Sequence, residues 1–266
     1  MGKSIPSFLC GGISAGEWGE FRPKSFARGF YLSRCNNIVL EAIAPYYHDN
    51  NMPLEKVYSV LKKFISPILD LDLWVTLHLT NGNDDTIPRF GAMNIAEKIV
   101  GKLINDFGPN SRIIICPIAE NSNQPNEEKL VRYCLDNWAA KGGHLIFNNG
   151  GRPRSLPGGY SLLDYHTQSG YDYGPQIGRM TLIDTDNGPI ISFLRYGAPA
   201  GKYWSPDRVR EFSTKCKQAG NGINLYAANC TMMNLDAMNV VGSVYNVRPK
   251  PSFIDKIIME IKLLKY

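Results

Sequence analysis

The carboxylates that could do chemistry in this chain lie in or directly after apolar runs. Glu120 follows the run at 112–119, and the run MTLIDTD at 180–186 contains Asp184 and Asp186. A carboxyl group at the edge of a buried strand is partly desolvated, which raises its pKa and suits a general acid. A second carboxylate can then attack the substrate or activate water. We therefore predict a catalytic pair made of Glu120 with Asp184 or Asp186.

The elements that must position these residues alternate along the chain. Short apolar runs predict eight strands, at 7–12, 37–47, 73–79, 112–119, 144–151, 160–166, 180–186 and 223–229. Helical periodicity predicts helices at 25–35, 53–69, 93–108, 127–143, 205–220 and 252–264. This alternation indicates a parallel sheet. Eight such units in a chain of 266 residues predict an α/β fold with one (β/α)8 TIM-barrel domain over residues 1–266.

Two gaps in this pattern leave alternatives open. No helix is evident between the fifth and sixth predicted strands, nor between the sixth and seventh. The segments TLID and PIISF could pair as a hairpin around TDNG, which would be an insertion on the barrel rim. An open doubly wound sheet is the main alternative fold, but no GxGxxG or phosphate-binding loop follows the first strand.

Polar and aromatic residues gather after the predicted strands. In a parallel barrel the carboxyl ends of all strands face one mouth, where active sites lie. Aromatic rings there can stack on the apolar face of a sugar, while amides and charged groups bind its hydroxyls. A carbohydrate is therefore the expected substrate, although any single ring could instead pack a loop onto the barrel. The candidate binding residues are Trp18, Tyr46, His78, Asn148, Arg152, Asp164, His166, Trp204 and Tyr226.

Two of the strand motifs resemble those of a known family. The run LWVTLHL, which contains His78, is similar to the histidine-bearing third strand of the large clan of (β/α)8 glycoside hydrolases, and IIICPIAEN resembles its fourth strand. The resemblance implies cleavage of a poly- or oligosaccharide with Glu120 as the acid/base. The clan's Asn-Glu pair is replaced here by Ala119-Glu120-Asn121, and its strand-seven glutamate by Asp184 or Asp186.

Two other functions fit the same residues. A metal-dependent hydrolase could bind its ion through His48, His78, Glu120, His166 and Asp186. The His-x-His that barrel amidohydrolases carry on their first strand is missing from FLCGG, however. The third possibility is a barrel that binds glycans without cleaving them, as part of a larger assembly. The favoured two-carboxylate hydrolase needs no cofactor and no metal.

Composition narrows the class of protein further. The net charge of +5 comes from scattered basic residues, so no nucleic-acid partner is expected. The sequence has no signal-peptide core and no run of roughly 18 apolar residues, so we expect a soluble protein without a membrane span. The six cysteines form no CxxC pair, and Cys116 should be a buried thiol. His144 opens a strand and should lie away from the mouth. The sequence leaves the oligomeric state and the localisation open.

Overall fold

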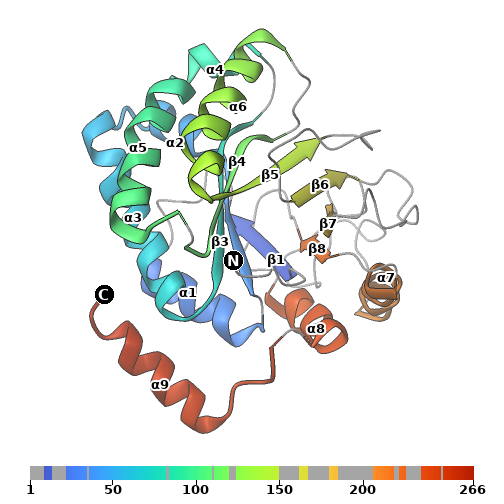
Figure 1. Cartoon of the computed structure of the whole chain (residues 1–266). Helices are drawn as coiled ribbons and strands as arrows, with labels where there is room; N and C mark the ends of the chain where they lie inside the picture. Colours follow the sequence, from blue (N-terminus) through green and yellow to red (C-terminus); the bar gives the residue numbers. More distant parts are fainter. Residues whose placement is uncertain are drawn as a thin grey trace.

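The computed structural model describes the strands of one closed parallel sheet. The described residues are 9–13, 22–34, 36–81, 84–109, 111–119, 124–149, 162–166, 180–184, 206–218, 222–225, 235–246 and 248–266. The strands among them are β1 (Leu9–Ile13), β2 (Asn37–Leu40), β3 (Trp74–Asn81), β4 (Ile113–Ala119), β5 (His144–Asn149), β6 (Leu162–His166), β7 (Met180–Asp184) and β8 (Gly222–Leu225). All pair in parallel in chain order, and β8 pairs with β1 (Figure 1). The predicted α/β class with a parallel sheet is confirmed.

Helices cover the outside of this sheet (Figure 1). They are α1 (Pro23–Leu32), α2 (Ile43–Asp49), α3 (Leu54–Asp70), α4 (Thr86–Arg89), α5 (Ala92–Phe107), α6 (Pro125–Asn137), the 3-10 turn η2 (Ala139–Lys141), α7 (Pro206–Gln218), α8 (Leu235–Tyr245) and α9 (Phe253–Leu263). All six predicted helices are present, whereas α2, α4 and α8 were not predicted. The segments after β5 and β6, and the proposed hairpin partner PIISF, lie outside the described residues. In the described ranges, every helix falls short of the length and apolarity that crossing a bilayer requires.

The prediction of one strand over 37–47 is wrong. The strand β2 ends at Leu40, and the helix α2 begins three residues later at Ile43. The reason is Pro45, which has no N–H to donate to a neighbouring strand but is well accommodated in the first turn of a helix. Ala42 makes the turn between the two elements in a left-handed conformation, with φ 52° and ψ 46°.

The two faces of β3 show how the barrel is filled. Successive residues of a strand point to opposite sides. Val75, Leu77 and Leu79 are buried in the hydrophobic core, which also contains residues of α1, α3 and α5. Thr76 and His78 have the opposite parity and are also buried, so they line the inside of the closed sheet. There the polar groups pair with one another, as when Asn37 Nδ2 donates to Thr76 Oγ1 at 2.9 Å.

The start of β5 is fixed by Trp138, which has the largest fully buried side chain among the described residues. Its indole nitrogen donates to the carbonyl oxygen of His144 at 3.0 Å. His144 is the first residue of β5, and its ring lies 5.7 Å from that of Trp74, the first residue of β3. This confirms that His144 lies at the amino ends of the strands, away from the mouth. Cys116 is a buried free thiol, as predicted.

Candidate active site

Three buried polar side chains lie towards the carboxyl ends of β2, β3 and β5. His78 of β3 and Asn148 of β5 are 3% and 2% exposed, and Glu41, which follows β2, is 9% exposed. Buried polar groups are costly unless they are paired, and each of these three has an interaction partner within the protein. Two of the three, His78 and Asn148, belong to the predicted binding residues, whereas Glu41 does not.

Glu41 lies beside His78 at the edge between β2 and β3. The last paired residues of these strands are Leu40 and Leu77, so Glu41 and His78 follow at the next register position. Adjacent strands lie about 4.8 Å apart. Continuing the alternation of Asn37 and Val39 puts Glu41 on the inner face with His78. A buried carboxylate next to an imidazole can orient the ring and favour its protonated form.

The backbone after Glu41 is strained. A left-handed conformation such as that of Ala42 costs a residue with a side chain about 1–2 kcal/mol. Such strain persists where the surrounding structure holds it, and it is concentrated at functional sites. Sequence analysis missed Glu41 because the predicted strand ran through it. Pro45 was the signal that could have ended the strand earlier.

The α2 helix carries two of the residues considered from sequence. Tyr46 was expected at the end of a strand, but it lies in α2, half-buried, with its ring edge-on to that of Tyr47 at 5.3 Å. His48 lies near the end of α2, where its Nδ1 is 3.0 Å from Asp49 Oδ1 and its ring packs against Phe90. His48 is exposed, whereas His78 is buried inside the barrel.

The strands β5, β6 and β7 place further candidates at paired positions. Asn148 of β5 pairs with Asp164 of β6. His166, the last residue of β6, pairs with Asp184, the last residue of β7. The parallel register therefore brings the backbone positions of these candidates together at the carboxyl ends of three adjacent strands.

For two of the remaining candidates, the structure describes only the strand that precedes them in the sequence. Glu120 comes one residue after the end of β4, and Tyr226 one residue after the end of β8. The candidates outside the described residues are Trp18, Glu120, Arg152, Asp186, Trp204 and Tyr226.

The helix that follows Glu120 already has its capping groups. Asp84 accepts hydrogen bonds from the backbone nitrogens of Asn126 and Glu127, at 2.7 and 3.2 Å, at the amino end of α6. Glu127 in turn accepts from the backbone nitrogen of Gln124 at 3.0 Å. A carboxylate is favourable at a helix amino terminus, but here Asp84 supplies it. The α6 helix therefore does not require Glu120 as its cap.

One buried hydroxyl of β3 has no hydrogen-bond partner among the described residues. Thr80 is fully buried, and its Oγ1 has no hydrogen-bond partner in the part of the chain that the structure describes. It lies two residues beyond His78, with the same parity along the strand, and pairs with Ile118 of β4. An unsatisfied buried hydroxyl costs about 1–3 kcal/mol, which marks Thr80 as a position of interest near the mouth.

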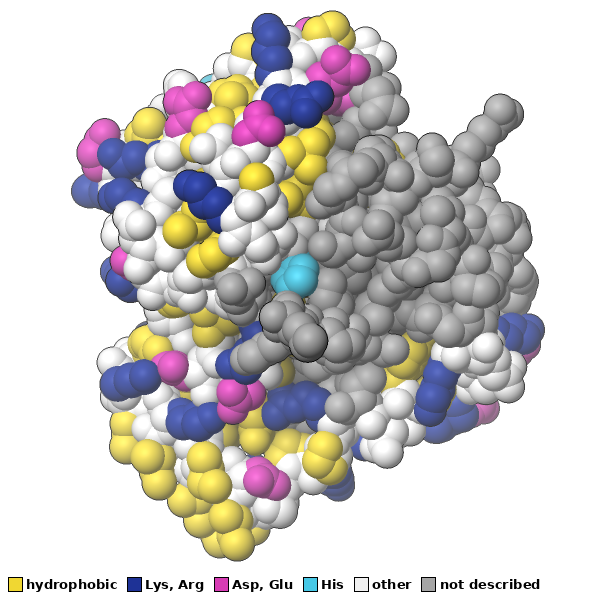
Figure 2. All heavy atoms as spheres, in the orientation of Figure 1, with side chains coloured by type: hydrophobic (Ala, Val, Ile, Leu, Met, Phe, Trp, Pro, Cys, Tyr) yellow, Lys and Arg dark blue, Asp and Glu magenta, His cyan; other side chains and the backbone are white. Residues whose placement is uncertain are grey.

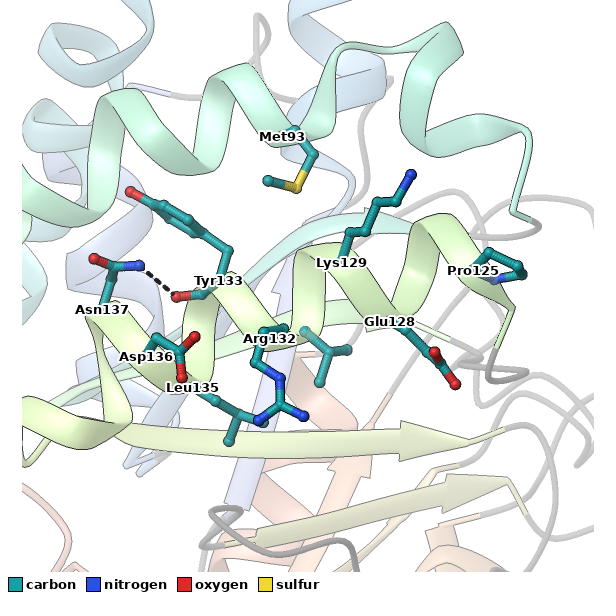
Figure 3. A pocket seen from close by; sticks show the side chains of 10 residues that line it. Met93, Pro125, Glu128, Lys129, Arg132, Tyr133, Leu135, Asp136 and Asn137 are labelled. Atoms are coloured by element: carbon teal, nitrogen blue, oxygen red, sulfur yellow. Dashed lines mark hydrogen bonds between the residues drawn. The ribbon is translucent and has the colours of Figure 1, made fainter.

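A hollow on the outer surface of α6 is separate from these residues (Figure 3). It has a volume of about 840 Å³ and is lined by Met93 of α5 and by side chains of α6, among them Lys129 and Arg132. None of the predicted site residues lines it. Within the ranges that the structure describes, no three His, Cys, Asp or Glu side chains are grouped as metal ligands.

Several solved structures with a similar fold are glycoside hydrolases. A family 5 glycoside hydrolase from Bacteroides vulgatus superposes with a TM-score of 0.61 and 11% identity, covering 91% of this chain and 67% of the other. A thermostable, halotolerant family 5 cellulase from an Icelandic hot-spring isolate gives 0.56 and 12%, covering 92% and 91%.

A more distant likeness extends to a second glycosidase family. The family 20 catalytic modules of a pneumococcal exo-β-D-N-acetylglucosaminidase give a TM-score of 0.52 and 12% identity, covering 96% of this chain and 87% of the other. No protein-family model and no curated protein sequence matches the chain significantly. At these identities the likeness shows the fold alone. The loose resemblance to (β/α)8 glycoside hydrolases is confirmed at that level.

Proposed function

We propose that the chain is a single-domain (β/α)8 glycoside hydrolase that cleaves a poly- or oligosaccharide with two carboxylates. One observation carries the proposal: in a closed parallel sheet, the paired positions of Asn148 with Asp164 and of His166 with Asp184 meet at one end of the strands. Buried His78 and Glu41 belong to the same end. The glycoside hydrolases that share this fold support the choice of substrate class.

Glu120 is the proposed general acid. It follows β4, whose residues Ile113 to Ile118 are all buried, so the strand gives it a rigid base. Because Asp84 caps the following helix, Glu120 is not needed for that structural role. Desolvation at the strand edge would raise the pKa of Glu120 and keep it protonated for transfer to the leaving oxygen.

Asp184 or Asp186 is the proposed nucleophile or base. The strand that carries Asp184, β7, is three strands round the barrel from β4. A separation of about 5–5.5 Å between the two carboxyl groups would give retention of configuration, and about 6.5–9.5 Å inversion. The other candidate residues, including Trp18, Arg152, Trp204 and Tyr226, would bind the sugar hydroxyls and stack on its rings.

Glu41 and His78 form a proposed positioning pair on the inner face. The buried carboxylate of Glu41 would orient the imidazole of His78, which would then donate to a sugar hydroxyl or carboxylate. The unpartnered hydroxyl of Thr80, on the same strand, would gain its hydrogen bond from the substrate or an ordered water.

The test is hydrolysis by the wild type and by Glu120→Gln, which keeps the shape of the side chain but cannot donate or accept a proton as a carboxyl. Release of reducing ends from soluble cellulose and of fluorophore from aryl β-glucoside, β-cellobioside and N-acetyl-β-glucosaminide would be followed. We expect turnover by the wild type and a loss of at least about 100-fold in Glu120→Gln. The matched control is Glu128→Gln, because Glu128 is an exposed carboxylate on the surface of α6.

Other outcomes of this experiment would argue against Glu120 or favour one of the two alternative functions. Unchanged turnover in Glu120→Gln would remove that residue from the mechanism. Turnover that a chelator abolishes and zinc restores would indicate the metal-dependent hydrolase. Binding of these glycans without cleavage by the wild type would indicate the non-catalytic barrel.

A further inference from the structure

The C-terminal helix α9 exposes a continuous apolar face. Figure 2 shows hydrophobic side chains gathered over this helix at the lower left of the molecule. Their exposed fractions run from 45% to 78%. With 3.6 residues per turn, their spacing forms one stripe along the helix. The residues are Phe253, Ile254, Ile257, Ile258, Ile261 and Leu264.

The opposite face holds α9 against the rest of the chain. Met259 and Leu263 are buried in the hydrophobic core. Glu260 pairs with Arg28 at 2.5 Å, and Lys262 pairs with Asp72 at 3.0 Å. The helix is thus already docked through one side, and the apolar stripe lies on the side that points away.

The stripe is larger than a soluble monomer usually exposes. A large apolar side chain exposes roughly 150–200 Å² when fully accessible, so the exposed fractions amount to about 600–700 Å². The largest apolar patch on a typical monomer measures about 300–600 Å². Two such stripes facing each other would bury about 1,200–1,400 Å², which falls within the roughly 1,200–2,000 Å² of stable interfaces.

Charges beside the stripe favour a second copy as the occupant. One edge carries Lys256 and Glu260, and the other edge carries Asp255 and Lys262. Glu260 and Lys262 also make the ion pairs with Arg28 and Asp72, so they lie between the docked face and the stripe. In an antiparallel pair of α9 helices centred near Ile258, each lysine lies opposite a carboxylate of the other copy.

We propose that two copies of this chain form a two-fold symmetric dimer through antiparallel α9 helices. The interface is isologous, because the same stripe serves both copies. Phe253 lies opposite Leu264 of the partner, while Ile257 and Ile258 meet near the two-fold axis. The balanced charges beside the stripe fit this partner better than an anionic membrane, for which interfacial helices carry mainly Lys and Arg.

The first test is the mass of the full chain in solution, by light scattering after size exclusion and by sedimentation equilibrium. One chain weighs 29.7 kDa, and we expect twice that mass at micromolar concentration. Ile257→Glu would bury one carboxylate from each copy at the centre of the dimer interface. It should raise the dimer dissociation constant by at least about 100-fold. Leu32→Glu is the control, because Leu32 is an exposed apolar residue of α1 outside the stripe. It should remain a dimer.

Cross-linking tests the register independently. Ile258→Cys lies near the two-fold axis and should form an intermolecular disulfide on mild oxidation. Leu264→Cys should not, because its two copies would be about 16 Å apart along the helix axis, beyond disulfide reach. The wild type, oxidised in parallel, controls for the native cysteines.

Three results would overturn the proposal. A wild-type monomer across micromolar concentrations would do so, and so would a dimer that Ile257→Glu leaves intact. The third is a monomer that sediments with vesicles of phosphatidylcholine and phosphatidylserine and loses this binding in Ile257→Glu, which would assign the stripe to a lipid surface.

Discussion

Replacing Gly143 by alanine tests how Trp138 fixes the first residue of β5, because the structure leaves no room for a methyl group at Gly143. A Cβ at this position would lie 2.4 Å from Cε2 and Nε1 of Trp138. Carbon atoms normally pack at about 3.5–4.0 Å, so the indole would have to move by about 1 Å. Trp138 is fully buried, and its indole nitrogen donates to His144, so the ring cannot move without losing that hydrogen bond.

We expect Gly143→Ala to lower the free energy of unfolding by about 2–4 kcal/mol. Overpacking contributes about 1–3 kcal/mol, and the lost hydrogen bond contributes about 1 kcal/mol. For a chain of this size, with a shift of about 2–4 °C per kcal/mol, the unfolding midpoint should fall by about 4–16 °C. The assay is thermal and urea unfolding followed by circular dichroism. The φ angle of Gly143 is not left-handed, so the cost comes from the contact with Trp138 and not from the backbone.

The matched control is Gly101→Ala in α5. A Cβ at Gly101 meets nothing within 4 Å, so this variant should be more stable than the wild type by about 0.5–1 kcal/mol. Replacing Trp138 by Leu should shrink the cost of Gly143→Ala, because the two residues are coupled. The reasoning is refuted if Gly143→Ala is neutral or stabilising, or if its cost is the same beside Leu.

Three further predictions follow from other parts of the structure. Glu41→Gln should leave unfolding nearly unchanged but lower kcat by at least about 10-fold, with less effect on KM, because the variant loses only the charge that we propose orients His78. Thr80→Val should raise stability by about 1 kcal/mol in urea unfolding while raising KM for the glycan, since Thr80 Oγ1 has no partner among the described residues. Burial raises the pKa of Asp72, but the hydrogen bonds and charges of Lys262 and Arg112 outweigh it and lower that pKa. Asp72→Asn should therefore unfold in less urea than the wild type at pH 7. This difference should be lost as pH falls from about 4 through the lowered pKa, and a difference that persists at pH 2 would contradict it.

The sequence predicted those elements whose pattern is local and strong. The run of buried residues from Ile113 to Ile118 could be recognised as an interior strand from composition alone. The 53–69 helix has apolar residues at helical spacing, and the structure gives α3 nearly the same bounds. Alternation of such elements was enough to predict the parallel sheet.

The elements that were missed depend on single residues or on distant contacts. Pro45 ended β2 early, and overlooking it hid both α2 and the buried Glu41. In α8, Gly242 interrupts the helical pattern, yet it allows close packing, because a Cβ there would lie 3.1 Å from Cβ of Arg34. That contact spans about 200 residues of sequence, so no local pattern could reveal it.

In the candidate site, too, some features follow from a local sequence pattern, whereas others depend on contacts between distant residues. His78 and Asn148 could be predicted because each lies at an inward position near the carboxyl end of a recognisable strand. The pairing of Asn148 with Asp164 depends on the register of the sheet, which the sequence does not specify. The lack of a partner for Thr80 among the described residues depends on the packing of its neighbours, which no local sequence pattern reveals.

The most direct test of the two-carboxylate account is the distance from the Glu120 carboxyl group to the nearer of Asp184 and Asp186 in a crystal structure. The account predicts about 5–9.5 Å across an open cleft at the carboxyl ends of the strands, with the value within that range indicating retention or inversion. A much larger separation, or a Glu120 carboxylate turned away from the cleft towards the amino end of α6, would contradict it.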